Sequence, residues 1–243
     1  MGVCFRGALV LILAMAFSIG GDAQSSTTLV PAIITFGDSA VDVGNNDYIP
    51  TIFRANYPPY GRDFITKKPT GRFCNGKLAT DITADTLGFT TYPPAYLSPQ
   101  ASGKNLLIGT NFASAASGYD DRTAALNNLY GLGARRIGVT SLPPLGCLPA
   151  ARTLFGFHER GCVSRINTDA QGFNKKINSA VSNLQKQLPE LKIAVFDIFK
   201  PLYDLVLLKQ AEVAVGPGRV HPSEAANQVL ADALIIEGIN LIG

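Results

Sequence analysis

Ser39 has the residue type and the position expected of a catalytic nucleophile. It follows the apolar, β-branched run 32–36, which Gly37 interrupts. We predict a buried strand over 32–36, so that Ser39 stands just past its carboxyl end, where open α/β sheets carry their reactive groups. A serine there becomes a nucleophile when a base takes its proton. The alternative is a Ser/Asp/Gly loop without chemistry, because the tripeptide alone is a weak signal.

The sequence contains two histidines, and their positions distinguish them. His221 comes directly before a predicted terminal helix that begins near Pro222 and Ser223. His158 lies beside a predicted disulfide and is expected at the surface. His221 is therefore the better candidate for the base that Ser39 needs. The alternative is an ordinary loop histidine.

The segment 113–118 consists of small residues, Ala-Ser-Ala-Ala-Ser-Gly. Small side chains let the backbone approach a ligand closely, and its amides can donate to an anion. Tight packing against a helix explains the same composition equally well. The sequence is compatible with both interpretations, a backbone that approaches a ligand and tight packing against a helix.

The elements that must position these residues alternate between strands and helices. This alternation predicts an α/β domain with a mainly parallel sheet. We predict strands over 32–36, 106–112, 137–142 and 193–198, and helices over 78–87, over 167–188 and from 222 onward.

Residues 1–23 have the features of a secretory signal peptide. Arg6 precedes the apolar run 7–19, and small residues stand near the expected cleavage after Ala23. The remaining residues 24–243 are expected to form a single domain. The net charge of +3 has no clustered basic face, so no nucleic-acid partner is expected. We expect no second membrane-spanning stretch and hence no stable membrane anchor.

Three of the four cysteines remain once Cys4 leaves with the signal peptide. Cys147 and Cys162 flank a short excursion and are the natural disulfide pair in an oxidising compartment. Cys74 is left over. It could be a free thiol, form an intermolecular bond or lack its partner, and we favour a missing partner.

Six segments occur in an order that carries a family resemblance. They are Phe36-Gly37-Asp38-Ser39 with Asp42 and Gly44-Asn45-Asn46, Pro58-Pro59-Tyr60-Gly61, Gly71-Arg72-Phe73 with Asn75-Gly76, Asn111-Phe112-Ala113-Ser114 with Gly118, Leu142 to Pro149, and His221-Pro222-Ser223. Together they resemble the plant GDSL esterase/lipases of the SGNH hydrolase superfamily. The resemblance implies a three-layer α/β/α, flavodoxin-like fold and a secreted enzyme of the cell wall or apoplast. Such an enzyme hydrolyses carboxylic esters of lipids, small acyl esters or cell-wall acyl groups, without cofactor or metal.

The resemblance also implies roles for individual residues. Ser39 would be the nucleophile, and its own amide would be one oxyanion donor. Gly118 would supply a second amide, although Ala115 and Ala116 replace glycines common in that segment. His221 would be the base.

Two family features are missing from the sequence. A strand ending in Gly-x-Asn-Asp should lie between Asn128 and Leu129, and neither Asn127 nor Asn128 replaces its asparagine. Gly218 stands three residues before His221, where the family has the aspartate that orients the histidine. A cysteine-rich segment is also absent, which would explain the orphan Cys74.

The departures shape two expectations. The sheet should lack one interior strand, and activity in this form should be impaired. Asp197, Asp204 or Glu224 could replace the missing carboxylate, and the spacing favours none of them. The alternative function is a catalytically dead relative that binds a lipid or a glycan.

Overall fold

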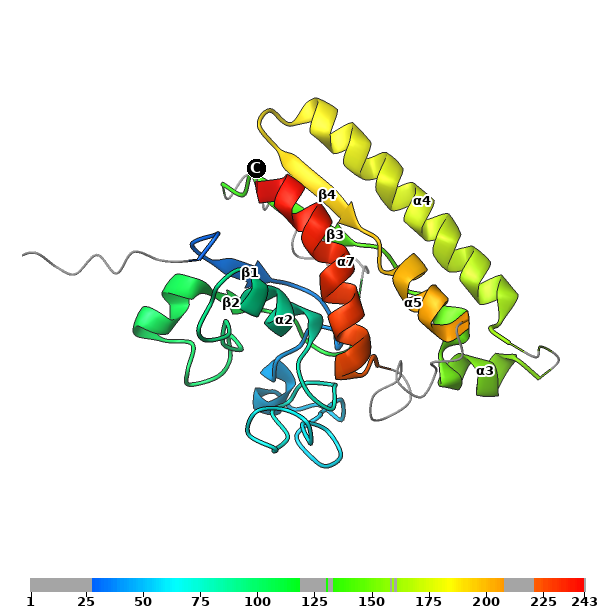
Figure 1. Ribbon diagram of the computed structural model, residues 1–243, viewed down its shortest axis with the longest axis horizontal. Helices are drawn as coiled ribbons and strands as arrows, with labels where there is room; N and C mark the ends of the chain where they lie inside the picture. The colour runs from blue at the N-terminus through cyan, green and yellow to red at the C-terminus, as the bar shows by residue number, and fades with distance from the viewer. Residues whose placement is uncertain are drawn as a thin grey trace, which may run out of the picture.

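The computed structural model (Figure 1) describes residues 28–118, 130, 133–157, 159, 161–207 and 221–242. Its strands and helices alternate along the chain, as predicted for an α/β protein. In chain order the elements are β1 (Ile33–Thr35), η1 (Asn45–Tyr48), α2 (Ala79–Thr86), η2 (Gly103–Ile108), β2 (Gly109–Asn111), β3 (Arg136–Thr140), η3 (Leu145–Cys147), α3 (Pro149–Phe155), α4 (Ser164–Gln187), β4 (Lys192–Phe196), α5 (Phe199–Leu207) and α7 (Glu224–Ile242). The predicted signal peptide lies outside the described residues.

The described strands form two parallel pairs. β1 pairs with β2 in the register Ile33↔Gly109, and β3 pairs with β4 in the register Arg136↔Lys192. The parallel direction was predicted, but a continuous sheet does not form within the described residues: no strand there joins β1 to β3. The predicted strand 106–112 is shorter than expected, because η2 takes up its first part.

The β1–β2 pairing requires a glycine at position 109. Gly109 has φ +97°, and a Cβ there would lie 1.9 Å from the carbonyl oxygen of Ile33. Glycine alone tolerates both the backbone conformation and this close approach. The β1–β2 register is therefore fixed at its first residue pair.

Helix α4 covers the β3–β4 pair. Its apolar residues recur at helical spacing, and Val181 packs with Leu191 and Ile193 in one buried cluster. The predicted disulfide between Cys147 and Cys162 is present and ties η3 to the start of α4. This half of the molecule is therefore held by both a core and a covalent link.

Helix α7 connects the two strand pairs. It contacts α2, α5, β3 and β4, and it runs between the two pairs in Figure 1. Ile235 and Ile242 of α7 pack against the cluster of Ala84, Leu87 and Phe89, to which Ile33 of β1 also belongs. The last described helix therefore substitutes, through side chains, for the backbone pairing that the two strand pairs lack.

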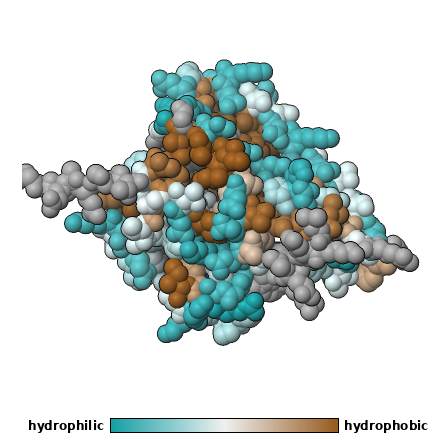
Figure 2. All heavy atoms as spheres, in the orientation of Figure 1, coloured by the Kyte–Doolittle hydropathy of each residue, from teal (hydrophilic) through white to brown (hydrophobic). Residues whose placement is uncertain are grey.

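Part of α7 is apolar and exposed. Ile236 and Ile239 are 67% and 56% exposed, and Figure 2 shows hydrophobic side chains gathered over this part of the helix. By length and composition, the 19 residues of α7 are apolar enough to cross a membrane. The expectation that no second stretch reaches that length is therefore wrong. The helical periodicity of the sequence does not reveal this long apolar stretch, because the apolar side chains of α7 face two strand pairs as well as solvent.

Candidate active site

Ser39 lies in a turn beyond the carboxyl end of β1, where the sequence placed it. The amide of Asp42 donates to the carbonyl oxygen of Asp38 at 3.0 Å and closes the turn. The amide of Ala40 donates to Asp38 Oδ1 at 2.9 Å, so the Asp38 carboxylate is held beside the serine. Ser39 is half-buried. Its position is thus fixed by local turn geometry.

A buried carboxylate fixes the loop that follows Ser39. Asp42 is fully buried and accepts hydrogen bonds from the amides of Gly44 at 2.8 Å, Asn45 at 2.7 Å and Ala115 at 3.1 Å. Burial raises the pKa of Asp42, and the backbone hydrogen bonds partly oppose that rise. The contact with Ala115 joins this loop to the segment after β2.

Two buried asparagines extend this connection. The side-chain amide of Asn45 donates to the carbonyl oxygens of Asn111 and Ala113, both at 2.8 Å. That of Asn46 donates to the carbonyl oxygen of Ala115 at 3.0 Å. The Asp42, Asn45 and Asn46 side chains therefore hold two loops together, and nothing in the sequence alone assigned them that task.

This packing explains part of the small-residue composition of the segment 113–118. Ala113 and Ala115 are buried against the asparagine network, as the packing interpretation expected. Ala116 has φ 75°, in the left-handed region, which supports the sequence argument that glycine suits this position. Gly118 is exposed, and a Cβ there would meet no atom within 4 Å.

The segment 71–76, which we call the His221 support, contacts the Ser39 loop on one side. A Cβ on Gly71 would lie 2.4 Å from the Cα of Gly44, so the two backbones touch. Val43 and Arg72 form an isolated antiparallel bridge. Arg72 is buried in a salt bridge with Asp81 at 2.8 Å, which anchors the support to α2.

The other side of the His221 support holds the start of α7. Asn75 Oδ1 accepts a hydrogen bond from the amide of Glu224 at 2.9 Å. Asn227 Nδ2 donates to Cys74 Sγ at 3.4 Å. Cys74 is a free, fully buried thiol, and burial raises its pKa to about 11. The sequence identifies this segment only as a family signature. The glycines at its two ends, Gly71 and Gly76, are the sign in the sequence that other chain segments pack closely against it.

His221 stands in the bend that leads into α7. Ser223 caps the helix, since its hydroxyl accepts from the amide of Ala226 at 3.2 Å. The ring of Phe73, from the His221 support, lies 5.0 Å from the imidazole ring. Burial lowers the pKa of His221, and the negative charge of Asp38 opposes that change. At neutral pH the imidazole is therefore uncharged and able to accept a proton.

The structure brings the Ser39 turn and His221 to the same region. The His221 support contacts both parts, through the bridge between Arg72 and Val43 and through the ring of Phe73 against the imidazole. No hydrogen bond joins the Ser39 hydroxyl to His221 in the described chain. His221 Nδ1 is buried and has no hydrogen-bond partner among the described residues.

Other residues considered from the sequence do not join this site. His158, Asn127, Asn128 and Gly218 lie outside the described residues. Asp197 instead accepts from the Ser141 hydroxyl at 3.2 Å, and Asp204 pairs with Lys200. Glu224 lies against Gly76. None of these three carboxylates bonds to His221.

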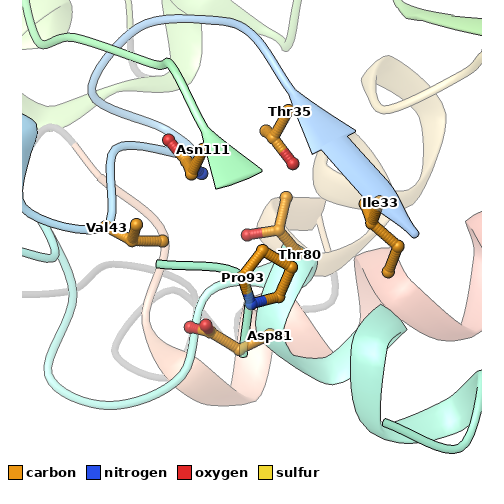
Figure 3. A pocket seen from close by; sticks show the side chains of 7 residues that line it. All are labelled: Ile33, Thr35, Val43, Thr80, Asp81, Pro93 and Asn111. Atoms are coloured by element: carbon orange, nitrogen blue, oxygen red, sulfur yellow. The ribbon is translucent and has the colours of Figure 1, made fainter. Parts of the chain in front are cut away.

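Neither Ser39 nor His221 lines the small pocket shown in Figure 3. Its lining consists of Ile33, Thr35, Val43, Thr80, Asp81, Pro93 and Asn111. Asp81 is engaged with Arg72, and Thr80 Oγ1 is buried without a partner in the described chain. In the part of the chain that the structure describes, no group of three or more His, Cys, Asp or Glu side chains is arranged to hold a metal ion.

The family model and the similar proteins that match this chain agree with one another. Residues 120–234 match the family model described as GDSL-like lipase/acylhydrolase. The Arabidopsis thaliana GDSL esterase/lipase APG is 47% identical over 355 aligned positions, covering 100% of both chains. The Arabidopsis GDSL esterase/lipases At5g22810 and At5g03810 are 42% and 39% identical, each over 88% of this chain and 91% and 93% of their own lengths. Because 355 positions exceed the 243 residues of this chain, the first relative has internal segments without a counterpart here.

Proposed function

Since this chain belongs to the plant GDSL esterase/lipase family and is a carboxylic ester hydrolase, we propose that Ser39 is its nucleophile and His221 its base. The substrates are esters of lipids, small acyl esters or cell-wall acyl groups. The observation that carries the proposal is the His221 support. Its Arg72 bridges to the Ser39 loop while its Phe73 ring contacts His221, so one short segment relates nucleophile to base.

The reaction follows from these positions. Ser39 Oγ attacks the ester carbonyl carbon as His221 accepts the hydroxyl proton, and the tetrahedral oxyanion is received by the amides of Ser39 and Gly118. His221 returns the proton to the departing alcohol, leaving an acyl-serine. Water then attacks the acyl-serine while His221 takes a proton from it; His221 returns that proton to Ser39 Oγ as the bond to the acyl carbon breaks, and the carboxylic acid leaves. The lowered pKa of His221 keeps it neutral for the first transfer.

Replacement of Ser39 tests the nucleophile. Ser39→Ala should reduce the rate of p-nitrophenyl acetate and butyrate hydrolysis by roughly a thousandfold or to the detection limit, because no acyl-enzyme can form. The matched control is Ser102→Ala, which replaces an exposed serine whose hydroxyl bonds only within its own turn. Equal rates for the Ser39→Ala protein and the unmodified chain would refute the assignment.

The location of the enzyme is a second part of the proposal. Residues 1–23 act as the signal peptide, and residues 24–243 form one hydrolase domain that is exported to the cell wall or apoplast. A fluorescent fusion carrying residues 1–23 should reach the extracellular space, whereas the fusion that begins at Gln24 should stay inside the cell. Identical distributions of the two fusions would exclude the signal-peptide role.

The unpartnered Nδ1 of His221 favours a second candidate function, a non-catalytic protein that binds a lipid or a glycan. A base without an orienting carboxylate works poorly in enzymes of this kind. A fluorophosphonate probe distinguishes the two candidates, because only an activated serine is labelled. Labelling that disappears in Ser39→Ala supports the hydrolase, and binding of ligand without any labelling supports the second candidate.

A further inference from the structure

Three large apolar side chains are exposed at the end of α3 and in the turn after it. Leu154, Phe155 and Phe157 are 61%, 53% and 80% exposed. Among the described residues, no other four consecutive positions carry three exposed large apolar side chains. We call these three residues the α3 tip. Apolar side chains that gather on a surface, unlike single exposed ones, mark a place of contact with a partner.

The chain excursion that carries the α3 tip is fastened at its base. The disulfide between Cys147 and Cys162 closes it. The amide of Val163 donates to the carbonyl oxygen of Gly146 at 2.8 Å, and the amide of Gly146 donates to Asn167 Oδ1 at 2.8 Å. Figure 1 shows α3 at an edge of the molecule, next to the first turns of α4. A fixed structure therefore presents the apolar side chains to solvent.

Positive charge flanks the α3 tip. Arg152 is exposed and lies three positions before Phe155 in α3, hence on the same face of the helix. Arg165, in the first turn of α4, has its guanidinium carbon 5.6 Å from the centre of the Phe155 ring. Neither arginine belongs to an ion pair of the described chain. The one carboxylate between them in the sequence, Glu159, accepts from the amide and the hydroxyl of Ser164 at 2.7 and 2.8 Å.

We propose that the α3 tip docks the protein reversibly on a lipid surface that carries negative charge. Phe and Leu side chains enter the boundary between headgroups and acyl chains, while the arginines beside them reach the lipid phosphates. A stable protein interface takes about 20–30 residues from each partner, many more than this tip offers. The inference deepens the proposed function, on which it rests, because it gives the place where the enzyme meets lipid esters. Docking itself needs neither Ser39 nor His221.

Binding to vesicles tests the proposal. The chain that begins at Gln24 is used, because the apolar run 7–19 would itself bind lipid. This chain should sediment with vesicles of equimolar phosphatidylcholine and phosphatidylglycerol, and Leu154→Ser combined with Phe157→Ser should weaken the binding about tenfold or more. Ile52→Ser is the matched control, since Ile52 is 91% exposed elsewhere on the chain and should not affect binding. Equal binding by L154S/F157S and I52S would overturn the proposal.

Arg152→Gln isolates the contribution of charge. It should weaken binding to the anionic vesicles about fivefold and leave the weaker binding to pure phosphatidylcholine vesicles unchanged, as expected for one basic side chain at an anionic surface. Arg136→Gln removes an exposed charge at the start of β3 and should change either binding by less than about twofold. Equal losses in R152Q and R136Q would contradict an anionic contact at the α3 tip.

Two further measurements distinguish other occupants and other surfaces. Ile239→Ser alters the exposed apolar part of α7, and a loss of vesicle binding in I239S but not in L154S/F157S would overturn the proposal in favour of α7. Analytical ultracentrifugation without vesicles tests for a second copy of the chain. A dimer that L154S/F157S dissociates, together with no vesicle binding by the unmodified chain, would make the α3 tip an interface between copies and overturn lipid docking.

Hydrolysis separates this inference from the proposed function. L154S/F157S should cleave dissolved p-nitrophenyl butyrate at the unmodified rate, but a long-chain p-nitrophenyl ester embedded in the anionic vesicles about tenfold more slowly. An equal loss on both esters would show that the α3 tip affects the site itself and would overturn its docking role. If the unmodified chain shows no Ser39-dependent hydrolysis of either ester, the proposed function fails, while vesicle sedimentation still decides whether the tip docks on lipid.

Discussion

Ala116 illustrates how a single backbone angle limits this site. The residue has φ 75°, and an L-residue in the left-handed region costs about 1–2 kcal/mol. It lies in the segment that carries the proposed oxyanion donor Gly118. Its neighbour Ala115 is buried in the core and has no such angle. Glycine is therefore favoured over alanine at position 116 and disfavoured at position 115.

We predict that Ala116→Gly stabilises the protein by about 0.5–1 kcal/mol, the relief of strain less the added entropy of the unfolded chain. Urea unfolding measures the change. Ala115→Gly is the matched control and should destabilise the protein by about 1 kcal/mol, because it removes a buried methyl group and adds chain entropy. Equal effects of the two substitutions would contradict the role of the angle.

His221 predicts a pH dependence of stability. Burial lowers its pKa from the usual 6.5, so the unfolded chain binds a proton more readily than the folded one. Its contribution is present above about pH 6.5 and is lost as pH falls through the folded pKa. Urea unfolding at pH 7.5 and pH 5.5 should show a smaller loss of stability for His221→Gln than for the unmodified chain. An unchanged loss in the variant would show that His221 is not the group responsible.

At the scale of elements, the His221 support is the feature that the sequence did not reveal. Its residue pattern was legible as a family signature, but its function depends on two contacts far apart in sequence. Arg72 bridges to Val43, and Asn75 accepts from the amide of Glu224. Contacts of this kind follow from tertiary packing, which local propensity cannot encode.

Phe73 offers the test of this support. Phe73→Leu should lower kcat about tenfold or more, because the imidazole loses the ring that it packs against. Phe89→Leu is the control, since Phe73 and Phe89 are both 6% exposed and, of the two, it is Phe73 that contacts His221. Both variants should lose stability by about 1 kcal/mol or more, as measured by thermal unfolding. A similar loss of kcat in the two variants would show that Phe73 contributes to the core and has no specific effect on His221.

Other elements could be predicted with less ambiguity. The apolar spacing of α4, the parallel strands and the Cys147–Cys162 pair were all read correctly from the sequence. Helices α3 and α5 were not predicted, because they have only seven and nine residues and each contains a proline in its first turn, Pro149 in α3 and Pro201 in α5. The hydrogen bonds that join Asp42 to the amide of Ala115 and Asn45 to the carbonyl oxygen of Asn111 could not be predicted either, since these partners are 73 and 66 residues apart in the sequence.

For the whole molecule, α7 is the element on which the two halves depend. Its Glu237 lies beside Asp197 at the end of β4, and the Glu237 Oε2 atom is buried without a partner in the described chain. Burial, followed by the charge of Asp197, raises the pKa of Glu237. A charged Glu237 therefore weakens the contact between α7 and the β3–β4 pair.

The Glu237→Gln variant should consequently be more stable at neutral pH. A carboxyl group whose pKa is raised on folding contributes stability below its unfolded value of 4.5, which is lost as pH rises through the folded pKa. E237Q should raise Tm by roughly 2 °C at pH 7 and by nothing at pH 4. The exposed Glu190→Gln is the control. A gain of equal size at both pH values would rule out this explanation.

The place of α7 in the chain also sets the order in which a nascent polypeptide acquires its parts. Ser39 and its loop leave the ribosome early, together with β1, whereas His221 and the helix that contacts both strand pairs leave after β4. A growing chain thus has Ser39 without His221, and two strand pairs without the helix that connects them. With Ser39 as the proposed nucleophile and His221 as the proposed base, both the complete site and the connected core form only after the residues of α7 have been translated.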